Sequence, residues 1–214
     1  MNKHKYLEGI WNQIPPDYYE EGRKKNYLQK IWHGEKVNKL KPFLSPKYKK
    51  ILDIGSGSGH ITHEIKKFLP NSEIWALDVY DKAINFGKKK YKDINFICAD
   101  AHNLPFPEES FDLIISTESL EHVCSPEGVL SEMRRVLKKN GEIIVEMDSG
   151  NSIFKLVWSL WTRIGPGKVW RKSHLTIFNS RKLKKMIIDA GFIIKKSKIS
   201  HFGMGIIYEA KKSI

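Results

Sequence analysis

The feature that most restricts the fold is a regular alternation of short apolar runs and helix-type segments from Lys49 onward. The apolar runs that are typical of buried strands occupy residues 51–54, 73–78, 94–100, 111–117 and 141–148. The segments with helical spacing between them occupy residues 59–69, 81–91 and 126–139, and Asn140-Gly141 predicts the end of the last one. Strand, helix and strand at this spacing predict a parallel sheet built from right-handed crossovers.

The rest of the chain completes the sheet and adds two irregular parts. Residues 180–192 predict a helix, and two strand-like runs follow, close enough in sequence to pair as a hairpin. Residues 1–48, with a predicted helix over 23–40, and an insertion at about 149–175 fall outside the alternation. We expect both to form walls of a site that the sheet alone does not enclose.

Charge and composition limit the partners and the location. The formal net charge of +13 favours anionic partners, but the lysines are scattered, so a solvated basic surface competes with a nucleic-acid interface. The N-terminus has no apolar signal core and no run is long enough to cross a bilayer, so we expect a cytoplasmic protein. Cys98 and Cys124 lack metal-ligand spacing and are expected to be buried or half-buried thiols in a reducing compartment.

A glycine turn follows the first predicted strand in the stretch ILDIGSGSGH. Such a turn between a strand and a helix brings bare backbone and helix-start N–H groups against a ligand. Gly55, Gly57 and Gly59 follow a GxGxG spacing, which is neither GxGxxG nor a phosphate-binding loop with Lys-Ser/Thr. Asp53 would repel a pyrophosphate but suits a ligand that carries an ammonium group.

Two further carboxylates end the next strands. Asp78 is placed to accept both hydroxyls of a ribose, and its alternative role is a helix N-cap, which Asp81 suits better. Asp100 could accept a hydrogen bond from the exocyclic amine of adenine. An ammonium site, a ribose site and an adenine site without a phosphate site together describe S-adenosylmethionine (SAM).

These residues, with ADAHNLPFPEESFDLIIS, ESLEHV, EMRRVLKKNGEIIVE and HLTIFNSRKLKKMIIDAGF, make the chain resemble class I SAM-dependent methyltransferases. Within that class it resembles the type-11 group, which includes quinone-biosynthesis methyltransferases. The resemblance runs from about Lys49 to the C-terminus. It implies an α/β, Rossmann-like, mostly parallel sheet of seven strands in the order 3-2-1-4-5-7-6, with the last strand antiparallel and helices on both faces. Residues 1–48 would form a helical cover and residues 49–214 the SAM-binding methyltransferase domain.

The resemblance places the methionine part of SAM at Asp53 and the glycine turn, the ribose at Asp78 and the adenine at Asp100 and Ala101. The predicted cofactor-binding residues are Asp53, Gly55, Ser56, Gly57, Gly59, Asp78, Val79, Asp100, Ala101 and Thr117.

Methyl transfer from a sulfonium needs alignment and exclusion of water, and a base only where the acceptor loses a proton. Glu118, Glu121 and His122 are spaced to share one helical face, and in some similar methyltransferases they hold a divalent cation. Their alternative role is hydrogen-bond support of the strand tip. His174 is expected at the pocket edge with a pKa near neutrality. The predicted catalytic residues are His174, Glu118 and His122. His33, Tyr18 and Tyr19 lie in the cover, where they could touch the substrate, although aromatic packing is the preferred role.

Residues 153–165 predict an apolar helix with a narrow polar stripe of Lys155, Ser159 and Thr162. It could form a lid over the site, rest on a membrane surface with basic residues such as Arg163, Lys168, Arg171 and Lys172, or pack as core or as a dimer face. The first two readings favour an apolar or lipid-like acceptor.

The sequence therefore predicts a SAM-dependent methyltransferase for a small, partly apolar or lipid-like molecule, methylated on oxygen or carbon. An RNA-modifying methyltransferase and a SAM-binding protein without catalysis remain alternatives. A nicotinamide oxidoreductase is disfavoured because GxGxG replaces GxGxxG. Peripheral contact with a membrane and a homodimer stay open.

Overall fold

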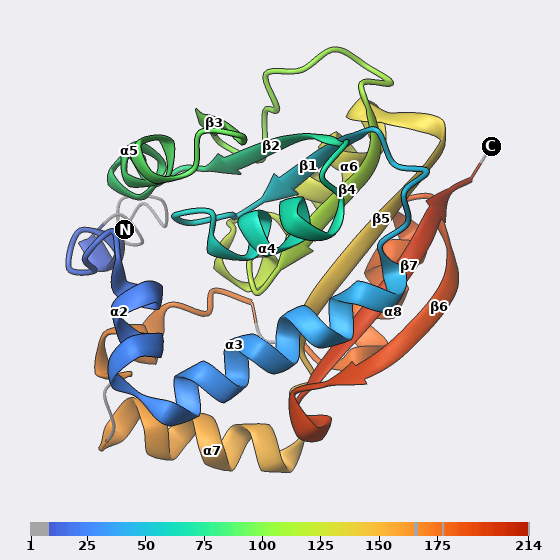
Figure 1. Cartoon of the computed structure of the whole chain (residues 1–214). Helices are drawn as coiled ribbons and strands as arrows, with labels where there is room; N and C mark the ends of the chain where they lie inside the picture. The colour runs from blue at the N-terminus through green and yellow to red at the C-terminus, as the bar shows by residue number, and fades with distance from the viewer. Residues whose placement is uncertain (1–8, 165–166, 177, 214) are drawn as a thin grey trace.

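The computed structural model describes residues 9–164, 167–176 and 178–213, which form one seven-stranded sheet in the order β3-β2-β1-β4-β5-β7-β6 (Figure 1). The strands are β1 (Lys50–Ile54), β2 (Glu73–Asp78), β3 (Asn95–Cys98), β4 (Phe111–Thr117), β5 (Leu137–Asp148), β6 (Phe192–Ser200) and β7 (Gly205–Lys212). Neighbours among β1 to β5 pair in parallel, whereas β7 runs antiparallel to both β5 and β6. The predicted order and the antiparallel last strand are confirmed.

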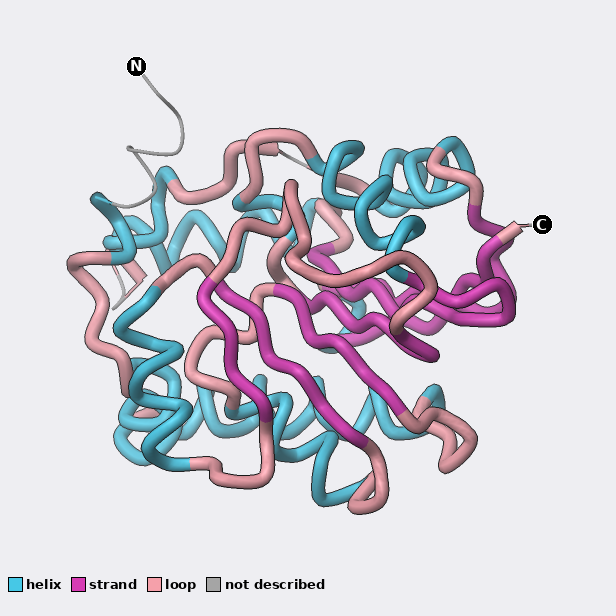
Figure 2. Tube along the Cα trace, turned by 90° about the horizontal axis from the view of Figure 1, so that it is seen from above, coloured by secondary structure: helices cyan, strands magenta, loops and turns pink. Residues whose placement is uncertain are grey.

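Helices cover both faces of this sheet, which Figure 2 shows as a central layer of strands. The helices are α2 (Tyr18–Lys25), α3 (Tyr27–Leu40), α4 (His60–Phe68), α5 (Asp81–Lys90), α6 (Pro126–Val136), α7 (Ser152–Arg163) and α8 (Ser180–Asp189). Short 3-10 turns are η1 (Lys41–Phe43), η2 (Leu120–His122), η3 (Lys168–Lys172) and η4 (His201–Gly203).

The strand period of two explains the two layers of core. Ile51 packs with Leu40 of α3 and Ile65 of α4, while its neighbour Leu52 belongs to the cluster that includes Met133 of α6 and Ile187 of α8. Both Ile51 and Leu52 are fully buried. Apolar side chains of this central parallel strand are therefore buried on both faces of the sheet.

Two predicted helix boundaries are wrong. Helix α6 ends at Val136 instead of Asn140-Gly141, because Leu137 adopts an extended backbone and pairs with Phe111 at the start of β4. The helix predicted over 23–40 is divided at Asn26, whose backbone is extended. The Asn26 side chain accepts a hydrogen bond from Gln29 N–H at 3.3 Å and so caps the start of α3.

Three side-chain expectations also differ from the structure. Cys98 and Cys124 are exposed, because Cys98 ends the edge strand β3 and Cys124 lies on the connection between η2 and α6. Thr162 is buried instead of lying on a polar stripe, and its hydroxyl donates to the Trp158 carbonyl at 2.8 Å. The side chains of Tyr19 and Lys172 lie outside the described part of the chain.

The N-terminal part and the insertion meet beside the sheet. Ile10, Ile14 and Trp170 form a buried cluster against which Trp158 and Trp161 of α7 pack. Helix α3 reaches the last hairpin, where Trp32 stacks on His201 with 4.0 Å between ring centres. None of the described helices is both long and apolar enough to cross a membrane.

Candidate functional site

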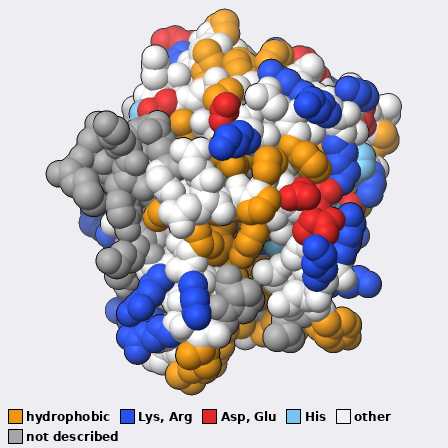
Figure 3. All heavy atoms as spheres, turned by 90° about the vertical axis from the view of Figure 1, so that its left-hand side faces the viewer, with side chains coloured by type: hydrophobic (Ala, Val, Ile, Leu, Met, Phe, Trp, Pro, Cys, Tyr) orange, Lys and Arg blue, Asp and Glu red, His pale blue; other side chains and the backbone are white. Residues whose placement is uncertain are grey.

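A cavity of about 180 Å³ lies at the carboxyl ends of β1, β2 and β4, and a smaller one of about 40 Å³ lies near α7. Figure 3 views this end of the molecule and shows hydrophobic side chains gathered over its centre. Trp11, Ile14 and Tyr18 from the N-terminal part and Trp170 from η3 line the cavity. Described residues of α7 line only the smaller cavity. Carboxyl ends of parallel strands are the usual place for a ligand in such sheets.

The glycine turn forms one wall of the cavity. Its backbone has positive φ angles, which are strained for any residue other than glycine. Gly55, Gly57 and Gly59 have φ angles of 76°, 54° and 81°. A Cβ on Gly55 would lie 2.1 Å from Ser119 Oγ. The hydroxyls of Ser56 and Ser58 are buried in the same wall without a hydrogen-bond partner. Unsatisfied hydroxyls of this kind suit a polar ligand.

Asp53 sits at the bottom of this wall, only 2% exposed. Burial and the neighbouring charge of Asp78 raise the pKa of Asp53 to about 7, although the carboxylate accepts the Thr62 hydroxyl at 2.6 Å. A buried carboxylate with so little compensation gains most from a cation that enters the cavity.

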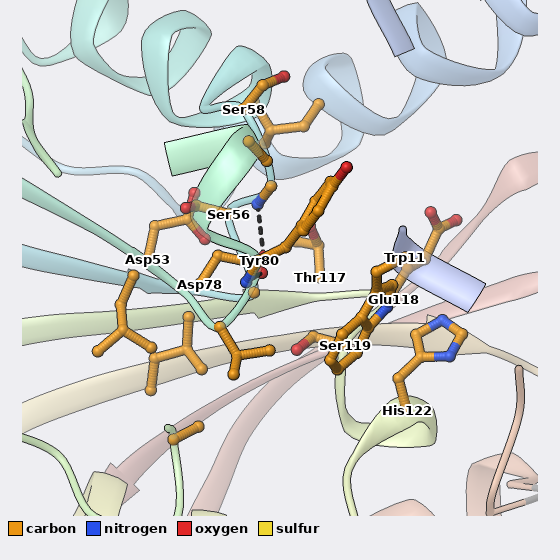
Figure 4. Close-up of a pocket in the computed structure, with 18 of the residues that line it drawn as sticks. Trp11, Asp53, Ser56, Ser58, Asp78, Tyr80, Thr117, Glu118, Ser119 and His122 are labelled. Atoms are coloured by element: carbon orange, nitrogen blue, oxygen red, sulfur yellow. Dashed lines mark hydrogen bonds between the residues drawn. The ribbon is translucent and has the colours of Figure 1, made fainter. Parts of the chain in front are cut away.

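Asp78 ties the second strand to the glycine turn. Its Oδ2 accepts Gly57 N–H at 2.8 Å, the contact drawn as a dashed line in Figure 4, and its Oδ1 accepts Tyr80 N–H at 2.9 Å. Burial raises the pKa of Asp78. The residue is not the N-cap of α5, which is Tyr80, and Asp81 lies in the first turn. Each carboxylate oxygen keeps a second lone pair, so Asp78 can still accept from a diol.

Asp100 is paired with a residue that sequence reasoning missed. Its Oδ1 accepts His102 N–H at 2.9 Å and lies 2.6 Å from His102 Nδ1. His102 Nε2 accepts Ser125 N–H at 3.1 Å, so the ring proton is assigned to Nδ1. Both residues line the cavity together with the predicted Val79, Ala101 and Thr117. The Asp-x-His spacing was the only sequence signal for this pair.

The fit of the cavity to a ligand follows from its charges. Among the lining residues whose side chains are described, Lys36 is the only Lys or Arg. Its Nζ lies 2.5 Å from Glu118 Oε2, so its charge is already compensated. Carboxylates at Asp53, Asp78 and Asp100 with no spare cation suit a positively charged adenosine derivative and disfavour a dinucleotide pyrophosphate.

Glu118 is the first residue after β4, and its backbone is left-handed with a φ of 47°. It accepts Trp32 Nε1–H at 3.1 Å in addition to its ion pair with Lys36. Burial alone would raise the pKa of Glu118, but Lys36 and His201 hold it well below its usual range. Glu118 is therefore an ionised anchor for α3 and a poor proton acceptor.

The expectation that Glu118, Glu121 and His122 share one helical face is wrong. The left-handed backbone of Glu118 keeps it out of η2, which spans only Leu120–His122. Glu118 groups with Glu146 and His201 instead. Glu121 and His122 come together with His174, with one ligand-type atom from each of the three within 4.8 Å of the others.

This second group has the features of a binding site for a cation. His122 Nδ1 donates to the Ser173 carbonyl at 2.9 Å, which leaves Nε2 with its lone pair. Burial lowers the pKa of His122. Glu121 is 3% exposed, and its Oε2 has no hydrogen-bond partner. Burial and the charges of Glu118 and Glu146 raise the pKa of Glu121 to about 8.

His174 differs from its predicted state. It lines the smaller cavity, and Trp158 stacks on its ring with 4.3 Å between centres. Burial and the nearby His122 lower the pKa of His174 to about 3, far from the neutrality expected of a loop histidine. The ring is unprotonated at physiological pH, which suits a ligand of a cation better than a general base.

Known proteins resemble this chain over the strands and turns that form the site. Residues 52–145 match the model of the family described as methyltransferase domain. A demethylmenaquinone methyltransferase of Thermotoga maritima is 38% identical over 96 residues, 45% of this chain and 42% of that protein.

Two further curated relatives carry the name ubiquinone/menaquinone biosynthesis C-methyltransferase UbiE. The one of Bordetella avium is 34% identical over 125 residues, 55% of this chain and 47% of that protein. The one of Pasteurella multocida is 29% identical over 165 residues, 67% of this chain and 62% of that protein. The chain thus spans about half the length of the curated relatives it matches.

Solved structures agree on the fold over nearly the whole chain. A SAM-dependent methyltransferase of Thermotoga maritima has a TM-score of 0.74 at 19% identity, with 94% of this chain and 99% of that one covered. One of Aquifex aeolicus has a TM-score of 0.68 at 16% identity, with 92% and 97% covered. The chain therefore has the Rossmann-like fold that the sequence predicted.

Proposed function

We propose that the chain is a SAM-dependent methyltransferase whose acceptor is a small, partly apolar ring of the quinone type. The observation that carries the proposal is the set of three carboxylates at the ends of β1, β2 and β3 around the glycine turn, without a free cation for phosphate among the described lining residues. The names of the relatives support a quinone-type acceptor. In this proposal residues 1–48 cover a SAM-binding domain that comprises residues 49–214.

Each wall of the cavity has a distinct part in holding the donor. Asp53 pairs with the ammonium group, while the Ser56 and Ser58 hydroxyls bond the carboxylate end. Asp78 accepts from the ribose, and Asp100 lies on the adenine side with Ala101. When bound, SAM supplies a methyl group on a positively charged sulfur. Trp11, Tyr18 and Trp170 keep water from the transfer path.

The acceptor lies on the other side of the cavity in this proposal, where Figure 4 shows Thr117, Glu118, Ser119 and His122. Without a bound ion, the free lone pair of His122 Nε2 can take a proton from an acceptor hydroxyl; with an ion bound, the same lone pair would ligate the ion instead. Glu121, His122 and His174 would hold a divalent cation, which would lower the pKa of that hydroxyl. Glu118 positions α3 and the strand tip without touching the proton.

The test is transfer of label from isotopically labelled SAM. Cell extract is incubated with the protein and then divided into lipid, RNA, protein and small-molecule fractions. We expect label in the lipid or small-molecule fraction and in an added hydroxyquinol, and Asp78→Ala should reduce it at least about tenfold through loss of the ribose contact. Label in RNA would establish the alternative substrate. Binding of SAM without transfer to any fraction would establish a non-catalytic SAM-binding protein.

The cation is tested separately from turnover. Equilibrium dialysis against Mg²⁺, Mn²⁺ and Zn²⁺, each followed by elemental analysis, should find one bound ion in the wild type and none in His174→Ala. Activity that survives thorough chelation would contradict the role given to the ion.

A further inference from the structure

Helix α7 carries a row of exposed aliphatic side chains. Ile153, Leu156, Val157, Leu160 and Ile164 are 59, 62, 42, 51 and 78% exposed. Their spacing of three and four residues puts them on one side of the helix, about a quarter of its circumference wide. We call these five side chains the α7 outer face. Monomeric proteins rarely expose so many large aliphatic groups side by side without a use for them.

The opposite side of α7 is already packed. Phe154 is buried, Trp158 stacks on His174, and Trp158 and Trp161 join the cluster of Ile10, Ile14 and Trp170. The helix is also fixed at its start, where Asn151 Oδ1 accepts Phe154 N–H at 2.8 Å. The outer face is thus presented by a helix that is held in place from behind.

The charge around this face has one sign. No Asp or Glu occurs between Ser149 and Ile188. Lys155 and Arg163 on α7, and Lys168 and Arg171 on η3, are all exposed. At the lower edge of Figure 3, the level at which Figure 1 shows α7, hydrophobic side chains lie next to a group of Lys and Arg side chains. An aliphatic face bordered by cations is complementary to a surface with an apolar interior and anionic head groups.

We propose that the α7 outer face docks the protein on an anionic membrane surface, with α7 lying in the interface plane. Leu156 and Leu160 would enter the acyl boundary, while Arg163 at the edge of the face would contact lipid phosphates. Attachment of this kind would be peripheral and reversible, because α7 would lie in the interface and would not cross the bilayer.

The chemistry of the face disfavours two other occupants. A second copy docked face to face would bring together two basic regions without an Asp or Glu between Ser149 and Ile188 to compensate them, which is a like-charge contact. Nucleic acid binds through stacking rings and hydrogen bonds to bases and phosphates, whereas the five side chains of the outer face are aliphatic.

Helix α7 lies beside the group of Glu121, His122 and His174, so docking through α7 would bring the acceptor site to the membrane. This step rests on the proposed function. The smaller cavity is lined by Phe154 and Lys155 of α7 and also by Glu121 and His174. The helix that would lie on the bilayer therefore borders the side of the site at which the acceptor is placed. A quinone-type acceptor dissolves in the membrane, so docking there shortens its path into the protein.

The experiment is co-sedimentation of the purified full chain with vesicles. Phosphatidylcholine vesicles that contain phosphatidylglycerol are compared with pure phosphatidylcholine vesicles. The test variant is Leu156→Glu with Leu160→Glu. The matched control is Ile188→Glu with Ile193→Glu, which changes the net charge equally at residues of α8 and β6 that are 48 and 49% exposed.

We expect binding to the anionic vesicles, a loss of at least about tenfold in the test variant and less than about twofold in the control. Equal losses in both variants would show that the net charge alone binds the vesicles and would overturn the proposal. Equal binding to neutral vesicles, or no vesicle binding by the wild type, would overturn it as well. So would sedimentation velocity that shows a wild-type dimer and a monomeric test variant.

Binding of SAM, measured by calorimetry in the same variants, separates this proposal from the proposed function. The outer face lies away from the glycine turn, so both variants should bind SAM as the wild type does. Vesicle docking with no methyl transfer would leave the membrane proposal standing and the proposed function refuted.

Discussion

Replacing Glu121 by glutamine should change how the stability of the protein depends on pH. The pKa of this buried carboxyl is raised to about 8 from an ordinary value of 4.5. Between these two values the folded state keeps a proton that the unfolded state releases, so stability falls as pH rises, by about 1.4 kcal/mol per pH unit. From about pH 5.5 to about pH 7.5 the wild type should thus lose about 3 kcal/mol through this group. The amide introduced by Glu121→Gln cannot ionise, so the variant should not show that loss.

The assay is urea unfolding at several pH values in the presence of a chelator. The free energy of unfolding of Glu121→Gln minus that of the wild type should rise steadily across this range. Glu132→Gln is the control, because Arg135 lowers the pKa of Glu132 and the stabilisation from that pair is lost only at acid pH. Its difference from the wild type should be negative and constant over the same range. Parallel pH profiles for Glu121→Gln and the wild type would refute the assignment of a buried neutral acid.

A divalent cation should make the wild type more stable than Glu121→Gln near neutral pH, which reverses the order expected without the ion. A divalent ion binds the ionised form of Glu121, so it should stabilise the wild type, release about one proton per ion near neutral pH and leave Glu121→Gln unchanged. Proton release can be followed in a weakly buffered solution with an indicator dye. Equal stabilisation of both proteins would place the ion elsewhere.

Three other substitutions test separate contacts. Gly55→Ala should cost about 1–3 kcal/mol in thermal unfolding and weaken SAM binding in calorimetry, since its φ is 76° and its Cβ would meet Ser119 Oγ at 2.1 Å. Lys36→Met should cost about 3–5 kcal/mol in urea unfolding because it removes the buried cation that pairs with the half-buried Glu118 and lies 3.9 Å from the fully buried Glu146, and adding Glu118→Gln should recover part of the loss. Asn151→Ala removes the cap of α7 and should cost about 1 kcal/mol in urea unfolding and lower vesicle binding. Unchanged stability of Gly55→Ala would contradict the first assignment. The second would be contradicted if Glu118→Gln did not recover stability lost in Lys36→Met, and the third if Asn151→Ala bound vesicles as the wild type does.

The sheet could be predicted because its signals are local. Each strand from β1 to β5 is a short apolar run followed by a segment of helical spacing, and the crossover rule then fixes the parallel direction. The end of α6 could not be predicted, because it depends on pairing of Leu137 with Phe111, 26 residues earlier. The cap signal at Asn140-Gly141 is local, and the long-range strand pairing ends the helix before it is reached.

The site divides in the same way. Carboxylates at successive strand ends meet by the geometry of a parallel sheet, so Asp53, Asp78 and Asp100 were placed beside one cavity from sequence. Lys36 was missed because its partner Glu118 lies far along the chain. A helical spacing of Glu118 and Glu121 gave no sign of the left-handed backbone that separates them. The pKa values of Glu121 and His174 arise from burial, which residue type alone does not reveal.

The position of β7 between β5 and β6 affects how the chain is made. The ribosome produces every residue before Gly205 earlier than this strand, yet the strand occupies an interior place in the sheet. Until it arrives, the edge of β5 has no neighbour and β6 has no partner, so both offer open backbone to other nascent chains. Folding of this domain should therefore finish late, in a single closing step, and ribosome stalling just short of Gly205 should leave a product prone to aggregate.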